Sequence, residues 1–253
     1  MTGRRLERIS ILAALLAGLM VAAISPTPLC AGGFNPNAPS FGVLFDAFNE
    51  NYRQALYATQ QGEKKRSSAE VAATRLAWGM LLLRYSETPP QAYRKDPRWQ
   101  ADLATISGYI DAAHAQLEAG NIPEAHATLE PIRRLWVDIN QRNGVRRFGD
   151  ELVRFHGVMG PLVQSAVAGV DESSIAEFRK KLDALVAGWR QVQHFGFAPK
   201  RAEDRKRFKE MVAAESLAID NLAKATKAKD YPGIASLAPK VKDAFAKLYL
   251  EFG

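Results

Sequence analysis

Apolar side chains recur at helical spacing along most of the chain. Six of them stand three or four positions apart in residues 41–61: Phe41, Leu44, Phe45, Phe48, Tyr52 and Leu56. This spacing is typical of one face of an α-helix. The same pattern predicts helices at about 67–85, 97–119, 123–141, 148–169, 173–194, 202–228 and 232–250. No segment shows the sustained alternation of a half-buried strand, so we expect an all-α protein.

Special residues predict where these helices begin and end. Ser67 and Glu70 stand in capping-box spacing, which favours a helix start. Two prolines break the segment "SETPPQAYRKDP" (86–97). Gly120 and Asn121 end the third helix, and Pro123 suits the first turn of the fourth.

The second half of the chain repeats the first. "DPRWQADLATISGYID" (96–111) aligns with "RKRFKEMVAAESLAID" (205–220), and the segment 118–136 aligns with 227–245 in the same register. The front halves match more loosely, "FGVLFDAF" (41–48) with "FGDELVRF" (148–155) and "SSAE" (67–70) with "SSIAE" (173–177). Four helices per copy predict two tandem antiparallel four-helix bundles, residues 32–145 and 146–253. One merged helical body is the alternative.

Two segments of the second copy resemble the cytochrome c′ family: "RFHGVMGPLVQSAVAG" (154–169) its first helix, and residues 227–253 its end. The resemblance implies a four-helix bundle that attaches haem through Cys-x-x-Cys-His. The corresponding positions here hold no thiol and no imidazole: Trp136, Ile139 and Asn140 in the first copy, Phe245, Leu248 and Tyr249 in the second. We therefore expect no covalent haem and no cofactor. The large side chains either fill the volume of a lost haem or are ordinary core residues.

The N-terminal segment 1–31 resembles an export signal. A basic start precedes an apolar run, and small residues precede a cleavage site after Ala31. An uncleaved membrane anchor is the alternative. Cleavage would remove three Arg, one Glu and the single Cys, so the net charge of +7 would fall to about +5. We expect a periplasmic protein without a stable membrane anchor. A partner protein with an acidic surface suits this charge, and nucleic acid is not expected.

Two pairs of side chains are candidate metal ligands. His156 and Met159 stand one helical turn apart, and an imidazole with a thioether suits copper. Asp111 and His114 have the same spacing. Neither pair completes a site. The sequence also lacks a nucleophile elbow, a Cys–His set and a phosphate-binding loop, so we do not expect an enzyme.

These observations favour a haem-free binding or accessory module. It would present helix faces, or a pocket near a fourth helix, to a protein or a small apolar ligand. The loops 86–97 and 194–200 are candidate contact surfaces, through Tyr93, Arg94, Phe195 and Phe197. The alternative function is a redox protein that binds a metal or non-covalent haem. A tetratricopeptide solenoid, suggested by the segment 115–132, ranks third because the chain repeats at a much longer period than such solenoids do.

Overall fold

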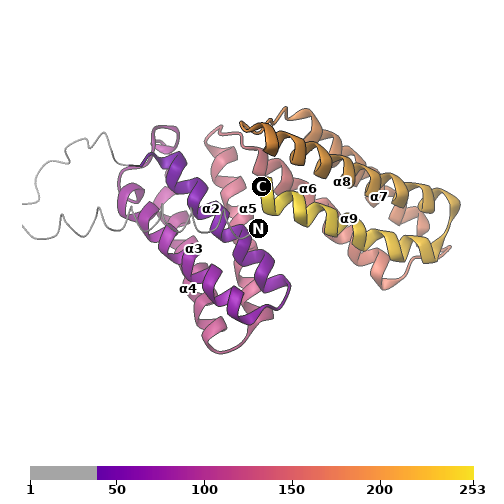
Figure 1. Cartoon of the computed structure of the whole chain (residues 1–253), viewed down its shortest axis with the longest axis horizontal. Coiled ribbons are helices and arrows are strands. Elements are labelled where there is room, and N and C mark those ends of the chain that lie inside the picture. Colours follow the sequence, from indigo (N-terminus) through magenta and orange to yellow (C-terminus); the bar gives the residue numbers. More distant parts are fainter. Residues whose placement is uncertain (1–38) are drawn as a thin grey trace, which may run out of the picture. The chain divides into compact units, whose positions relative to one another are not determined.

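The computed structural model describes residues 39–253, which form one compact unit. Eight α-helices and one short 3-10 helix follow one another in this range, and it contains no strand (Figure 1). They are α2 (Phe41–Gln60), α3 (Lys64–Tyr85), η2 (Gln91–Tyr93), α4 (Trp99–Glu118), α5 (Ile122–Arg142), α6 (Phe148–Ala168), α7 (Ile175–His194), α8 (Ala202–Ala228) and α9 (Tyr231–Phe252). The all-α prediction is confirmed. The predicted signal peptide lies outside the described residues.

The helices form two quartets. In the first quartet α2 packs on α3, α3 on α4, α4 on α5, and α5 returns to α2. In the second quartet α6, α7, α8 and α9 repeat this ring of contacts (Figure 1). The chain therefore has a tandem four-helix-bundle arrangement. The predicted boundary after residue 145 falls in the connection between α5 and α6.

The two quartets contact each other through their first and fourth helices. Helix α2 packs on α9, and α5 packs on α6. The Asn49 side chain donates a hydrogen bond to the Gly253 carbonyl at 3.0 Å. The guanidinium of Arg147, just before α6, lies 4.1 Å from the centroid of the Phe45 ring and pairs with Asp46 at 3.4 Å. One buried hydrophobic cluster includes residues of both quartets.

A repeated hydrogen bond establishes the register of the two copies. The Trp78 indole donates to the Ser107 hydroxyl at 2.9 Å, and the Trp189 indole donates to the Ser216 hydroxyl at 2.9 Å. The two serines stand 109 positions apart, in the register of the sequence repeat, whereas the two tryptophans stand 111 apart. The stretch from tryptophan to serine, which contains the connection between the second and third helices, is therefore two residues longer in the first copy.

The structure corrects two predictions about α3. Helix α3 begins at Lys64, so Ser67 lies inside the helix, fully buried, and does not cap it. The helix can start early because Gly62, with a φ of 70°, ends α2 in a tight turn. By the tryptophan register Ser67 corresponds to Phe178, so the match of "SSAE" with "SSIAE" is also wrong.

Within residues 39–253, none of the helices combines the length and the apolar composition needed to cross a bilayer.

Candidate functional site

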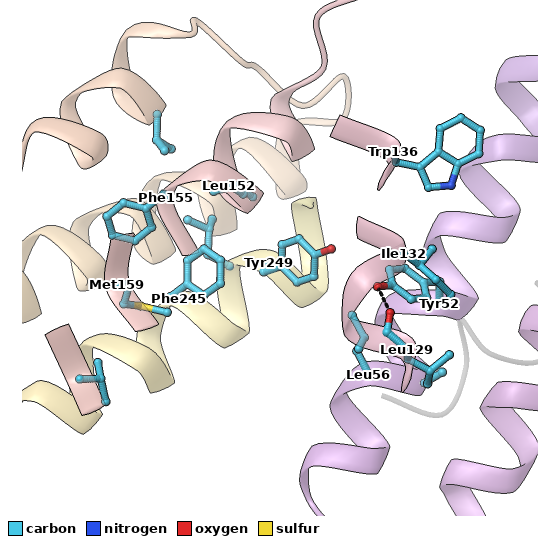
Figure 2. Close-up of a cluster of buried hydrophobic side chains, with 14 of the residues drawn as sticks. Tyr52, Leu56, Leu129, Ile132, Trp136, Leu152, Phe155, Met159, Phe245 and Tyr249 are labelled. Carbon is cyan, nitrogen blue, oxygen red and sulfur yellow. Dashed lines mark hydrogen bonds between the residues drawn. The ribbon is translucent and has the colours of Figure 1, made fainter. Parts of the chain in front are cut away.

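A cavity of about 270 Å³, here called the junction cavity, lies where the first and fourth helices of both quartets meet. Helices α2, α5, α6 and α9 all contribute to its lining. Its apolar wall consists of Leu56, Met159, Val163, Phe245, Ala246 and Leu250. Figure 2 shows Leu56 on the first-quartet side and Met159 and Phe245 on the second-quartet side. Pockets of about 300–1,000 Å³ hold drug-sized ligands, so this cavity suits a small molecule.

A chain of polar contacts runs along the other wall. The Thr59 hydroxyl lies 3.0 Å from Nδ1 of His126, and Nε2 of His126 lies 3.4 Å from the Glu130 carboxylate. Glu130 forms an ion pair with Arg133, whose Nη2 lies 3.3 Å from Nε2 of His156. The contacts thus connect α2 with α6 through α5. They tie the first quartet to the second across the cavity.

Arg133 is the centre of this chain. Its side chain is only 6% exposed, and its guanidinium lies 5.6 Å from the centroid of the Tyr249 ring on α9. Its backbone N–H donates to the Tyr52 hydroxyl at 3.2 Å, and Tyr52 donates to the Leu129 carbonyl at 2.8 Å (Figure 2). Its Nε has no hydrogen-bond partner among residues 39–253. Residues of the two quartets thus surround one buried cation, the Arg133 guanidinium, whose Nε–H has no hydrogen-bond partner among the described residues.

Burial and neighbouring charges set the protonation states. Burial, together with Arg133 and Lys242, lowers the pKa of His156 to about 4, and burial also lowers the pKa of His126. Both imidazoles are therefore neutral at pH 7. Because a guanidinium can only donate, Nε2 of His156 accepts from Arg133 and the ring proton sits on Nδ1. Burial alone would raise the pKa of Glu130, but Arg133 outweighs it and the net pKa is lowered, so this carboxylate is ionised.

The charges around the junction cavity do not cancel. Arg53, Arg133 and Lys242 are cations, and Glu130 is the one carboxylate among the lining residues of the described range. With neutral histidines, three positive charges against one negative charge leave an excess of +2. The cavity therefore has the electrostatic character of an anion site with an apolar wall beside it.

A second cavity, of about 430 Å³, lies between the same four helices and shares Arg53, Arg133 and Tyr249 with the first. Four acidic side chains and three arginines line it: Asp46, Glu50, Asp150, Glu251, Arg53, Arg133 and Arg147. Its charged lining thus has no cationic excess. The two cavities differ in the ligand charge that they favour.

The two candidate pairs of metal ligands lie in different parts of the structure. His156 and Met159 both line the junction cavity. Asp111 and His114 lie on α4, which contributes nothing to that cavity, and exposed Asp111 pairs with Arg75 at 2.8 Å. Within residues 39–253, no group of three or more His, Cys, Asp or Glu side chains could hold a metal ion.

The positions that correspond to a haem-attachment motif belong to the core. All six side chains there are buried: Trp136, Ile139, Asn140, Phe245, Leu248 and Tyr249. The Trp136 ring packs edge-on against Phe45 at 4.7 Å, and Phe245 lies 5.6 Å from Phe155 (Figure 2). These residues do not fit a covalent haem, because they offer no thiol.

The predicted loop contacts are mostly not at the surface. Tyr93 is 2% exposed, stacks on Trp99 at 4.9 Å and donates to Asn140 at 2.8 Å, so the expectation that it is exposed is wrong. The loop folds back as η2 and closes the end of the first quartet with this ring. Phe195 and Phe197 are half-buried and pack on Phe148. Arg94 is exposed, as predicted.

Sequence reasoning missed most of the cavity. It singled out His156 and Met159 but not Arg133, Glu130 or Lys242. The spacing of Glu130 and Arg133 in "EPIRRLW" indicates only a local ion pair. A stronger signal was that Arg133 directly follows Ile132 on the apolar side of α5 and corresponds to Lys242 in the repeat register.

The chain matches no family model, no curated protein and no solved structure. The resemblance to the cytochrome c′ family therefore stays a prediction.

Proposed function

We propose that the protein is an exported, haem-free binding protein that takes a small, partly apolar ligand into the junction cavity. The observation that carries this proposal is the cavity itself, which combines an apolar wall with a few convergent polar groups, the usual composition of a ligand site. Its two histidines and Glu130 already contact Thr59, Arg133 or one another without a ligand. Binding therefore costs little side-chain entropy. The proposed export rests on the predicted signal peptide, and the term haem-free rests on the absence of the attachment motif of the cytochrome c′ family, which the chain resembles.

The apolar wall would supply most of the affinity. Each methylene group that leaves water contributes about 0.8 kcal/mol. Met159 suits such a wall because its unbranched thioether adapts to different shapes. Of the predicted loop contacts, Arg94 alone is fully exposed. The cavity, and not the loops, is therefore the better basis for the function.

Filling the cavity tests the proposal. Gly160 lines the junction cavity, and a Cβ added there would meet no atom within 4 Å. Gly160→Leu should therefore extend its side chain into the cavity. Because residue 160 precedes Pro161, and a side chain before proline disfavours helical backbone, the thermal unfolding of the variant is measured beside its binding. Gly157→Leu is the matched control, because Gly157 lies on the same helix, has equal space and does not line the cavity.

The readout is saturable binding of the neutral fluorescent probe N-phenyl-1-naphthylamine. We expect binding by the wild type and Gly157→Leu, and at least ten-fold weaker binding by Gly160→Leu. Equal binding by all three proteins would contradict the proposal. Native mass spectrometry of protein from the host envelope would then identify the resident ligand and the cleavage site.

A metal or non-covalent haem protein is the second candidate, because His156 and Met159 lie in the same cavity. The position of Arg133 disfavours it. Its Nη2 already engages Nε2 of His156 at 3.3 Å, and a guanidinium there repels a metal cation. Titration with copper and with haem, followed by visible absorption, tests this alternative. A new absorption band that His156→Gln abolishes would favour it.

A further inference from the structure

The charge of the junction cavity specifies the ligand further, on the basis of the proposed function. We infer that the ligand is an anionic amphiphile, with a carboxylate head and an aliphatic tail. The head lies against Arg133 and Lys242, and the tail lies along Met159 and Phe245.

The repeat itself creates the cationic excess. Arg133 on α5 and Lys242 on α9 stand 109 positions apart, so they are corresponding residues of the two copies. Each quartet therefore places one of these corresponding cations at the same cavity, and Arg53 of α2, which is not repeated, is a third. The acid is not repeated, because Pro239 stands where the first copy has Glu130. The repeat thus brings two corresponding cations to the cavity but only one carboxylate, Glu130.

Arg133 has hydrogen-bonding capacity to spare. A guanidinium has five N–H donors, and in this structure Nη2 faces Glu130 and His156 while Nε has no partner among residues 39–253. A buried donor without a partner is costly. Nε is closed to solvent, so a carboxylate in the cavity would lie beside the guanidinium and offset its charge.

The apolar wall requires the rest of the ligand to be a hydrocarbon. Met159 is 1% exposed and Phe245 is 2% exposed, and Val163 and Leu250 complete that side of the cavity. A small inorganic anion would leave this wall without a partner. The second cavity offers a built-in contrast, because four acidic side chains line it. A carboxylate is therefore favoured in the junction cavity and disfavoured in its neighbour.

Calorimetric titration of the purified protein with octanoate and with octan-1-ol tests the head group at constant tail length. We expect octanoate to bind at least ten-fold more tightly than octan-1-ol at low salt. The difference should shrink as salt is added, since ions screen the lysine more than they affect the tail. Octylammonium should bind more weakly than either.

Charge-removing variants locate the head group. Lys242 is exposed, so Lys242→Met should fold, and we expect it to weaken octanoate about three-fold while leaving octan-1-ol unchanged. Lys247→Met is the matched control on the same helix, since Lys247 does not line the cavity. Arg133→Gln should weaken octanoate more than ten-fold. The Lys242 variant keeps the test valid if Arg133→Gln fails to fold.

The outcomes separate this inference from the proposed function. If octan-1-ol binds as tightly as octanoate, or octylammonium binds more tightly, the anionic head group is wrong and the apolar ligand site stands. If octanoate binds best but Lys242→Met and folded Arg133→Gln change nothing, the assigned head-group position is wrong. If neither octanoate nor octan-1-ol binds, the proposed function fails and this inference fails with it.

Discussion

Replacing Glu215 by glutamine should stabilise the protein, and the gain should grow as the pH rises. Glu215 lies on α8, is fully buried, and neither of its carboxyl oxygens has a hydrogen-bond partner among residues 39–253. Its counterpart in the first copy, 109 positions earlier, is the fully buried Ile106. The second quartet thus has an acid where the first quartet has a core hydrocarbon.

The magnitude follows from the pKa of this carboxyl. Burial raises the pKa of Glu215 from 4.5 to about 8. Below pH 4.5 both folded and unfolded chains carry the proton, so the acid does not alter stability. Above pH 4.5 the unfolded chain ionises and the folded chain does not, so stability is lost until the pH passes the folded pKa. At about 1.4 kcal/mol per pH unit, the loss is roughly 3 kcal/mol at pH 7 and approaches about 5 kcal/mol above pH 8.

Urea unfolding followed by circular dichroism at pH 5, 7 and 8.5 measures this loss. An amide does not titrate, so the stability difference between Glu215→Gln and the wild type isolates the carboxyl. We expect that difference to increase by about 4 kcal/mol from pH 5 to pH 8.5. Asp220→Asn is the control, because Asp220 is exposed on the same helix and should show no such trend. A difference that stays constant with pH would refute the reasoning.

Three further predictions concern other polar groups. The pKa of His156 is lowered from 6.5 to about 4, so the wild type should lose about 3 kcal/mol relative to His156→Gln as the pH falls from 6.5 to 4, measured by urea unfolding. Arg142→Met should cost about 1–3 kcal/mol, because exposed Arg142 pairs with Asp96 and Asp102, whose side chains are buried; thermal unfolding measures the loss. Ser107→Ala and Ser216→Ala should each cost about 1 kcal/mol, since each removes the partner of a tryptophan indole.

Each of these has a control variant. For the acid limb, His156→Gln is itself the reference for the wild type. Arg94→Met should leave the melting temperature unchanged, because Arg94 is exposed. Thr105→Ala removes an exposed hydroxyl on α4 that bonds only within its own helix. A similar cost for Thr105→Ala and Ser107→Ala would contradict the role of the repeated tryptophan–serine bond. An equal acid loss in His156→Gln and the wild type would contradict the lowered pKa.

The sequence also contained the signal for Glu215. Phe208, Val212, Glu215, Ile219 and Leu222 follow one another at intervals of three or four on α8. This places the acid on the apolar face, and the register of the repeat pairs it with Ile106. Periodicity and repeat together were enough to predict a buried carboxyl.

By itself, the sequence determined the helices, their approximate ends and the repeat of a four-helix unit. These features depend on residues within a few turns of one another, because i, i+3 and i, i+4 spacing decides which face of a helix is apolar. Tertiary structure decided the rest. It buried Tyr93 under its own loop, and it brought Arg133 of α5 against His156 of α6 and Tyr249 of α9. No local pattern specifies these contacts, because the packing of whole helix faces from two copies of the repeat decides which helices meet. That packing depends on the sum of many weak van der Waals contacts across the interface.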